Sequence, residues 1–390
     1  ATVVLFFLTS TNIGFMIAAT ALTARRLGMR DRDGARRIAG ASMGWLMLLS
    51  VLLALLLLLS ARHVLALLGA DGRVAEAAHG YLMITLPSNI LMALGMGFSG
   101  ILRAVGDANR SMYVTLTGAI VTAVLDPLLI FGLGLGIHGA AICLVVSRLV
   151  FALVGWWGAV RIHAMVARPE WPAMREEASA IAGIAGPAIL TNIATPFATA
   201  VVARIVSEQG DWAIAANAVI DRLIPIAFGA LFALSGAVGP IMAQNWGANR
   251  FDRMRRALRD SFLFAGCYVL ASWIILVLFR YQLVALFALK GPAAEGLIFF
   301  CWISGPMWFF IGLLFTANAA FNNLGFPLYS TYLNWGRATI GTIPFAWVGA
   351  HFHGYEGALA GMALGSVLFG VAGAVLSIRA VRMLERRAAG

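Results

Sequence analysis

Residues 38–61 carry the sequence IAGASMGWLMLLSVLLALLLLLSA, which contains no charged side chain. A helix needs about 20 mostly apolar residues to cross the hydrocarbon core of a bilayer, so this stretch is long enough to span one. The apolar run is continuous and does not alternate with polar residues, which favours a helix over a barrel strand. The stretch therefore predicts a transmembrane helix.

Similar apolar stretches recur along the whole chain of 390 residues, of which 61% are hydrophobic and 12% are charged. A soluble domain carries about 25% charged residues, so this composition excludes a soluble enzyme as well as a disordered chain. We predict an all-α membrane protein, a polytopic helical bundle whose partner is the lipid bilayer. About eleven spans are expected, at 1–24, 38–61, 79–102, 111–135, 137–160, 181–206, 213–243, 257–280, 293–320, 327–350 and 355–380.

Basic residues are distributed unequally between the loops. One set of alternate loops, together with the C-terminal tail, holds 20 arginines, whereas the other set holds 4 basic residues. Cytoplasmic loops of membrane proteins carry an excess of Arg and Lys, so we expect the arginine-rich loops and the C-terminus to lie in the cytoplasm. Short basic runs between apolar spans explain the net charge of +11 without a nucleic-acid partner.

The two halves of the chain resemble each other at an offset of about 219 residues. GMRDRDGARR from Gly28 matches GANRFDRMRR from Gly247, and GIHGAA from Gly136 matches GYEGAL from Gly354. Ordered matches at nearly one offset indicate a duplication into two pseudo-symmetric, parallel six-helix lobes. We place these lobes at 1–160 and 181–390, joined by a cytoplasmic linker at 161–180. The offset also predicts that the first lobe here misses one helix before residue 1.

Three stretches then resemble one known family. GFSGILRAVGDANRSM at 97–112, LDPLLIFGLGLGIHGAA at 125–141 and MAQNWGANR at 242–250 are similar to the multidrug and toxic compound extrusion (MATE) family. The resemblance implies a twelve-helix antiporter of the bacterial inner membrane that works by alternating access. It also implies export of amphiphilic, often cationic, drugs and toxic compounds, driven by Na⁺ or H⁺. We expect a monomer.

Asp126 is the strongest candidate for a functional residue within a predicted span. Insertion of a charged side chain near the centre of a membrane helix costs about 2.5–3.5 kcal/mol. Such a residue therefore requires a bonding partner or a functional role. Thr122 lies one turn earlier on the same face, and Pro127 has no N–H group to bond the Ala123 carbonyl. These oxygens suit a hard cation such as Na⁺, and a buried carboxyl group can equally hold a proton. The alternative is that Asp126 only joins its helix to a neighbour.

The resemblance is incomplete at three positions that matter for the coupling ion. The family often has Asn where this chain has Thr122, and Thr where it has Leu144. Some relatives carry Glu in the first helix of the second lobe, where this chain has Thr195. These departures weaken a Na⁺ site carried over from the family and favour H⁺ as the coupling ion. No other metal site and no cofactor is expected.

Asp221, Arg222 and Arg337 are further charges within predicted spans. Adjacent helical residues point in different directions, so Asp221 and Arg222 cannot serve one partner together. We favour bonds between helices for all three, and the alternative is a charge that faces a cavity or gate.

Three alternative functions differ in the residues they require. A lipid-linked oligosaccharide flippase of the same superfamily would have a more basic central cavity. An integral-membrane transferase would need a clustered His, Asp or Glu pair, and none is evident. A pure scaffold would have no use for acids within its spans. We therefore predict a cation-coupled antiporter that is not an enzyme.

Overall fold

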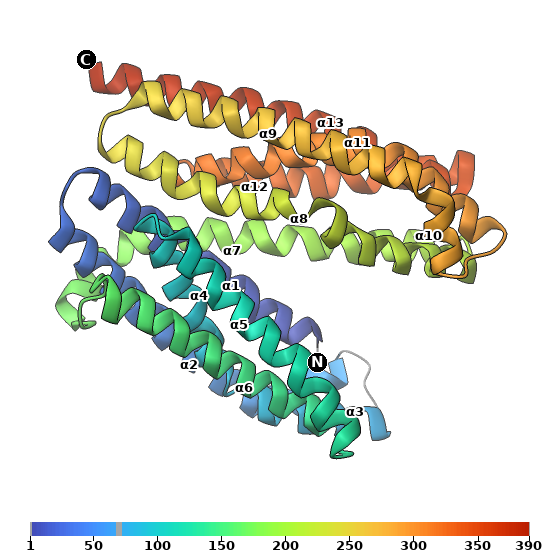
Figure 1. Ribbon diagram of the computed structural model, residues 1–390, viewed down its shortest axis with the longest axis horizontal. Helices are drawn as coiled ribbons and strands as arrows, with labels where there is room; N and C mark the ends of the chain where they lie inside the picture. The colour runs from blue at the N-terminus through green and yellow to red at the C-terminus, as the bar shows by residue number, and fades with distance from the viewer. Residues whose placement is uncertain (1, 68–71, 390) are drawn as a thin grey trace. The chain divides into compact units, whose positions relative to one another are not determined.

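The computed structural model describes residues 2–67 and 72–389 (Figure 1). These residues form helices joined by short turns, and no strand occurs among them, so the predicted all-helical class is confirmed. Contacts within the chain divide it into two compact units, unit 1 at 1–189 and unit 2 at 190–390. The dividing point lies within one long helix. The lobe boundaries inferred from the sequence, at 160 and 181, stay predictions.

Unit 1 packs around small and apolar side chains such as Ala18, Ala39 and Phe98. The first half of its last helix is attached by Trp45, whose Nε1 atom donates to the Met174 carbonyl at 2.8 Å. The helices and π-helical turns are α1 (Thr2–Gly28), α2 (Arg32–Leu67), α3 (Gly72–Thr85), α4 (Asn89–Ala104), α5 (Ala108–Pro127), η1 (Leu128–Gly132), α6 (Gly136–Trp156), η2 (Trp157–Ile162) and the start of α7 (Trp171–Ser207).

Unit 2 has a larger apolar core in which Phe228 stacks on Trp308 with ring centroids 4.7 Å apart. Its glycines allow close helix contact, since a Cβ atom at Gly365 would overlap the backbone of Gly341. After α7 its elements are α8 (Asp211–Gly247), α9 (Phe251–Leu278), α10 (Arg280–Leu286), α11 (Pro292–Asn323), α12 (Pro327–Gly336), η3 (Arg337–Thr342) and α13 (Ile343–Ala389).

The helices are consistent with about eleven membrane crossings. Nine stretches in the described part of the chain are long and apolar enough to cross, and the pair α3 and α4, bent by 50°, makes a tenth. One of the nine, Pro327–Ala388, is 62 residues long, which is far more than a bilayer requires. It breaks at His353 and Gly354, where the backbone is not helical, so it provides two crossings.

The duplication is visible in the turns that end corresponding helices. After α1, the Asp31 amide donates to the Arg26 carbonyl at 3.0 Å, and after α8 the Arg250 amide donates to the Asn245 carbonyl at 2.8 Å. This bond closes a helix over a residue with positive φ. Positive φ recurs at the repeat offset in four pairs: Arg30 with Asn249, Gly72 with Gly291, Gly106 with Gly325, and Gly136 with Gly354. The two halves therefore share turn geometry as well as sequence.

Candidate functional site

Asp126 lies at the end of α5, where α5 packs against α6. The Cys143 thiol of α6 lies next to its side chain and donates to the Thr122 carbonyl at 3.8 Å. A thiol is a weak donor, and no ion pair to Asp126 occurs among the described residues. The half-buried Asp126 carboxyl group therefore has no basic side chain as an ion-pair partner in the described part of the chain.

Thr122 belongs to the same polar cluster, one turn before Asp126. Its Oγ1 atom lies 3.0 Å from the Gly118 carbonyl and 2.9 Å from Ser147 Oγ on α6. Ser147 Oγ in turn donates to the Gly118 carbonyl at 2.8 Å. The structure thus brings Thr122 and Asp126 to one face of α5, and it adds Cys143 and Ser147, which the sequence analysis did not select.

The backbone beside Asp126 leaves regular α-helical geometry. Pro127 has no N–H group, and the following amide, that of Leu128, donates to the Leu125 carbonyl. The chain then widens into the π-helical turn η1, in which the Leu133 amide donates to the Leu128 carbonyl at 2.9 Å. Widened turns of this kind are frequent at functional sites, because they free backbone groups and re-aim side chains. The sequence predicted the disruption at Pro127 but not the π-helical form.

Arg337 begins another π-helical turn, η3 of unit 2. Its side chain is half-buried, and its Nε atom has no hydrogen-bond partner within the described part of the chain. Trp335, two residues earlier, donates to the Leu190 carbonyl of α7 at 3.0 Å. Charged residues therefore adjoin all three π-helical turns: Asp126 precedes η1, Arg161 lies in η2, and Arg337 begins η3.

Asp221 and Arg222 lie on an exposed part of α8, and their side chains diverge as helical geometry requires. Asn217 Nδ2 donates to Asp221 Oδ2 at 3.1 Å. Tyr355 is buried, and its hydroxyl group has no hydrogen-bond partner in the described chain. The charge of Asp221 interacts with this hydroxyl group. No ion pair joins Asp221 or Arg222 to Arg337 among residues 190–389.

Arg148 is a functional candidate that sequence reasoning missed. It is 7% exposed in the core of unit 1, and it donates to the Thr85 carbonyl at 3.0 Å and to Ser88 Oγ at 2.8 Å. Both acceptors lie at the break between α3 and α4, where Pro87 interrupts the helix. The sequence did indicate this contact, because Pro87 lies within one apolar span and Arg148 lies within another.

Beside this break is a buried polar layer that the sequence analysis also missed. Asn12 of α1 donates to Asn89 of α4 at 3.1 Å, and Ser50 of α2 donates to Asn12 at 3.3 Å. All three side chains are 1% exposed, and one nitrogen of Asn89 has no partner in the described chain. Polar groups with no access to water hold helices in one register, because any shift leaves them unpaired.

The loops of unit 1 carry a separate charged cluster around Asp107, the residue that caps α5. Arg110 NH1 donates to Asp107 Oδ2 at 2.5 Å, and Arg32 donates to the His163 carbonyl at 3.1 Å. Burial raises the pKa of Asp107, but the hydrogen bonds from His163 and Arg110 outweigh it and lower this pKa to about 2. In the described residues, no group of three or more His, Cys, Asp or Glu side chains could hold a metal ion.

Comparison with known proteins now identifies the family. The family model described as MatE matches residues 1–128 and 187–348. An FAD transporter of Shewanella oneidensis is 31% identical over 314 residues, which cover 79% of this chain and 69% of that protein. The multidrug export protein MepA of Staphylococcus aureus is 25% identical over 287 residues, covering 72% of this chain and 62% of MepA.

Among solved structures, the Vibrio cholerae MATE transporter VcmN in its bent form has the same fold. The TM-score is 0.90 at 23% identity, and the alignment covers 97% of this chain and 86% of VcmN. The family model matches most of both halves, and the transporter from Shewanella oneidensis is similar over more than two thirds of its length. This chain therefore belongs to the MatE family of membrane transporters.

Proposed function

We propose that this chain acts in a cation-coupled antiporter that exports small amphiphilic, often cationic, organic compounds by alternating access. The observation that carries the proposal is the position of Asp126 between Thr122, Cys143 and the π-helical turn η1. An acid in a lipid-spanning helix without a neighbouring cation is suited to take up and release a proton or Na⁺. The named activity of MepA, multidrug export, supports the class of substrate.

The mechanism needs two arrangements of the helices around Asp126. The turn η1 gives α5 a place to bend, because its backbone hydrogen bonds are already out of α-helical register. Proton or cation binding at Asp126 biases unit 1 towards one arrangement, in which the exported compound binds less tightly. By thermodynamic reciprocity, the compound then lowers the affinity for the ion by the same factor. No chemical bond is made or broken, so the protein is a transporter and not an enzyme.

The unequal distribution of arginines supports one orientation in the inner membrane. The turns after α1, α4, α6 and α8 and the C-terminal end of α13 face the cytoplasm in this proposal. Attachment of a membrane-impermeant thiol reagent to Cys introduced at Arg256 in intact cells would contradict it. The three native cysteines must be replaced first.

A second candidate substrate is an anionic nucleotide such as FAD, which the relative from Shewanella oneidensis transports according to its name. The half-buried Arg337 favours it, because a guanidinium group with a free Nε atom suits a phosphate oxygen. Arg337→Gln should then reduce FAD export and leave export of a cationic dye unchanged. Equal effects on both compounds would remove Arg337 from substrate selection.

The main test is uphill export by Asp126→Asn in membrane vesicles with matched protein levels. Asn keeps the size and hydrogen bonding of Asp but cannot titrate, so export driven by either a pH gradient or a Na⁺ gradient should fall to background. Asp33→Asn is the matched control, because the Asp33 side chain is 97% exposed in the first turn of α2. Near wild-type export by Asp126→Asn under both gradients would show that Asp126 only joins helices.

A further inference from the structure

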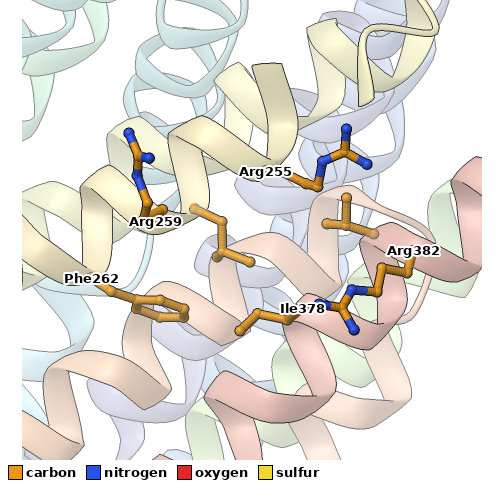
Figure 2. Close-up of a pocket in the computed structure, with 7 residues that line it drawn as sticks. Arg255, Arg259, Phe262, Ile378 and Arg382 are labelled. Atoms are coloured by element: carbon orange, nitrogen blue, oxygen red, sulfur yellow. The ribbon is translucent and has the colours of Figure 1, made fainter. Parts of the chain in front are cut away.

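A groove of about 250 Å³ lies between α9 and α13 of unit 2, at the ends of these helices that carry the arginine-rich segments. Figure 2 shows Phe262 of α9 and Ile378 of α13 close together, with the guanidinium group of Arg382 beside Ile378 and that of Arg255 turned away from both. Leu258 and Val381 are fully or almost fully buried at its base. The groove therefore combines an apolar floor with arginine side chains.

The three arginines that line the groove differ in their partners. Arg255 forms an ion pair with Glu385 of α13, and Arg259 pairs with its neighbour Asp260 at 3.0 Å. Arg382 has neither a hydrogen bond nor an ion pair in the described part of the chain. A guanidinium group has five N–H donors, so Arg255 keeps donors free while it is paired. Arg382 is thus available to an anion beside the apolar floor, and Arg255 adds positive charge to the same groove.

The charge around this end of unit 2 is strongly positive. The first turns of α9 and the last turns of α13, with the residue before α9, hold nine arginines and three acids. The arginines are 250, 253, 255, 256, 259, 379, 382, 386 and 387, and the acids are 252, 260 and 385. The surrounding arginines would therefore attract an anion in the groove, in addition to the arginines that contact it directly.

Farther along α9 and α13, away from the arginine-rich segments, the surface of the two helices is apolar. Leu263 and Leu270 of α9 and Val371 and Val375 of α13 are exposed large apolar side chains farther along the same two helices. They belong to stretches that are apolar enough to cross a membrane. The groove thus lies where the polar boundary of a bilayer meets its hydrocarbon core.

We propose that this groove binds an anionic phospholipid, with the phosphate at Arg382 and an acyl chain along Phe262 and Ile378, while Arg255 adds positive charge to the same groove. Arginine forms charge-assisted hydrogen bonds to phosphate oxygens, and basic pockets between membrane helices suit such headgroups. Free phosphate would gain nothing from the apolar floor, whereas a lipid uses both ends of the groove. The proposal is independent of the coupling ion and of the exported compound.

The test measures lipid binding to the purified full chain in neutral detergent by native mass spectrometry. Dioleoylphosphatidylglycerol is compared with dioleoylphosphatidylcholine, which has the same acyl chains and no net charge. We expect the anionic lipid to bind on the order of tenfold more tightly. In Arg255→Gln/Arg382→Gln this preference should disappear. Equal binding of the two lipids to the unaltered chain would overturn the proposal.

The matched control is Arg253→Gln/Arg386→Gln, which removes the same charge from the same two helices outside the groove. It should keep most of the preference for the anionic lipid. If both double variants lose it equally, the attraction is diffuse and the groove is not a site. Arg382→Gln alone removes no hydrogen bond or ion pair of the described chain, so it tests the site without disturbing the Arg255–Glu385 pair.

Two further measurements distinguish a lipid site from a general anion site. Ile378→Ala leaves every charge in place and should weaken binding of the anionic lipid several-fold, because it removes part of the apolar wall. Inorganic phosphate added in large excess should not displace the lipid. Displacement by phosphate, or unchanged lipid binding in Ile378→Ala, would show a general anion site instead.

Discussion

The Nε2 atom of His163 lies 2.7 Å from the Oδ2 atom of Asp107, and this contact fastens the segment after η2 to the start of α5. Arg110, in the first turn of α5, donates to the same carboxylate oxygen, so one side chain both pairs with α5 and joins it to the segment after η2. The contact lies in the loops, where water and protons reach it. It therefore provides a pH-dependent element outside the membrane-spanning helices.

Stability should fall as the pH drops through the titration of Asp107. Its pKa is lowered from 3.8 to about 2, so between these values the unfolded state binds more protons than the folded state. The contribution of Asp107 is fully present above pH 5 or so and is lost as the pH falls towards about 2. Asp107→Asn should flatten this part of the profile, measured as melting temperature against pH. Asp33→Asn should leave the profile unchanged. Equal profiles for the unaltered protein, Asp107→Asn and Asp33→Asn would show that Asp107 does not cause this pH dependence.

Replacing Thr122 by Ala separates the two coupling ions. A Na⁺ ion needs a shell of oxygen ligands, so loss of the Thr122 hydroxyl group should weaken a Na⁺ site on the order of tenfold. A proton on Asp126 needs no such shell. We expect proton coupling, so Thr122→Ala should keep most of the export driven by a pH gradient. Thr117→Ala, which removes an exposed hydroxyl group from the same helix, is the control. Loss of Na⁺-driven export in Thr122→Ala alone would favour Na⁺.

Arg148→Leu should destabilise unit 1. The change removes the hydrogen bonds from Arg148 to Ser88 Oγ and to the Thr85 carbonyl, which still accepts from Ser88 Oγ at 2.8 Å. Hydrogen bonds from a charged donor contribute about 1.5–3 kcal/mol each. We expect a clear drop in melting temperature in detergent. Arg204→Leu is the control, since the Arg204 side chain is 85% exposed. A melting temperature equal to that of the control would show that the break between α3 and α4 needs no donor.

Gly365→Ala should disturb the contact between the two parts of unit 2 that flank the kink in α13. The new Cβ atom would overlap the Gly341 carbonyl oxygen, and backbone cannot move aside as a flexible side chain can. Overpacking of this kind costs about 1–3 kcal/mol. Gly186→Ala places the same methyl group in open space on α7 and should be neutral or stabilising. Thermal unfolding of both variants checks this, and a stable Gly365→Ala protein would refute the close contact.

Much of the fold follows from the sequence alone, because its causes are local. A continuous apolar run such as 38–61 specifies a spanning helix, since each backbone N–H group finds its acceptor within the same segment. Gly106 and Gly325 specify matching turns in the two halves, because a positive φ suits glycine. The cost of an acid within a span likewise marked Asp126 before any contact was known.

Only the tertiary structure decided which polar groups meet. Cys143 and Ser147 lie beside Asp126 and Thr122 because of how α5 rotates against α6, and helical periodicity does not define that rotation. Arg148 reaches a helix break 60 residues away, and Arg255 meets Glu385 130 residues away. These contacts depend on packing between helices, which many side chains determine together. A single sequence therefore shows which residues need partners, and the packing determines which partners they find.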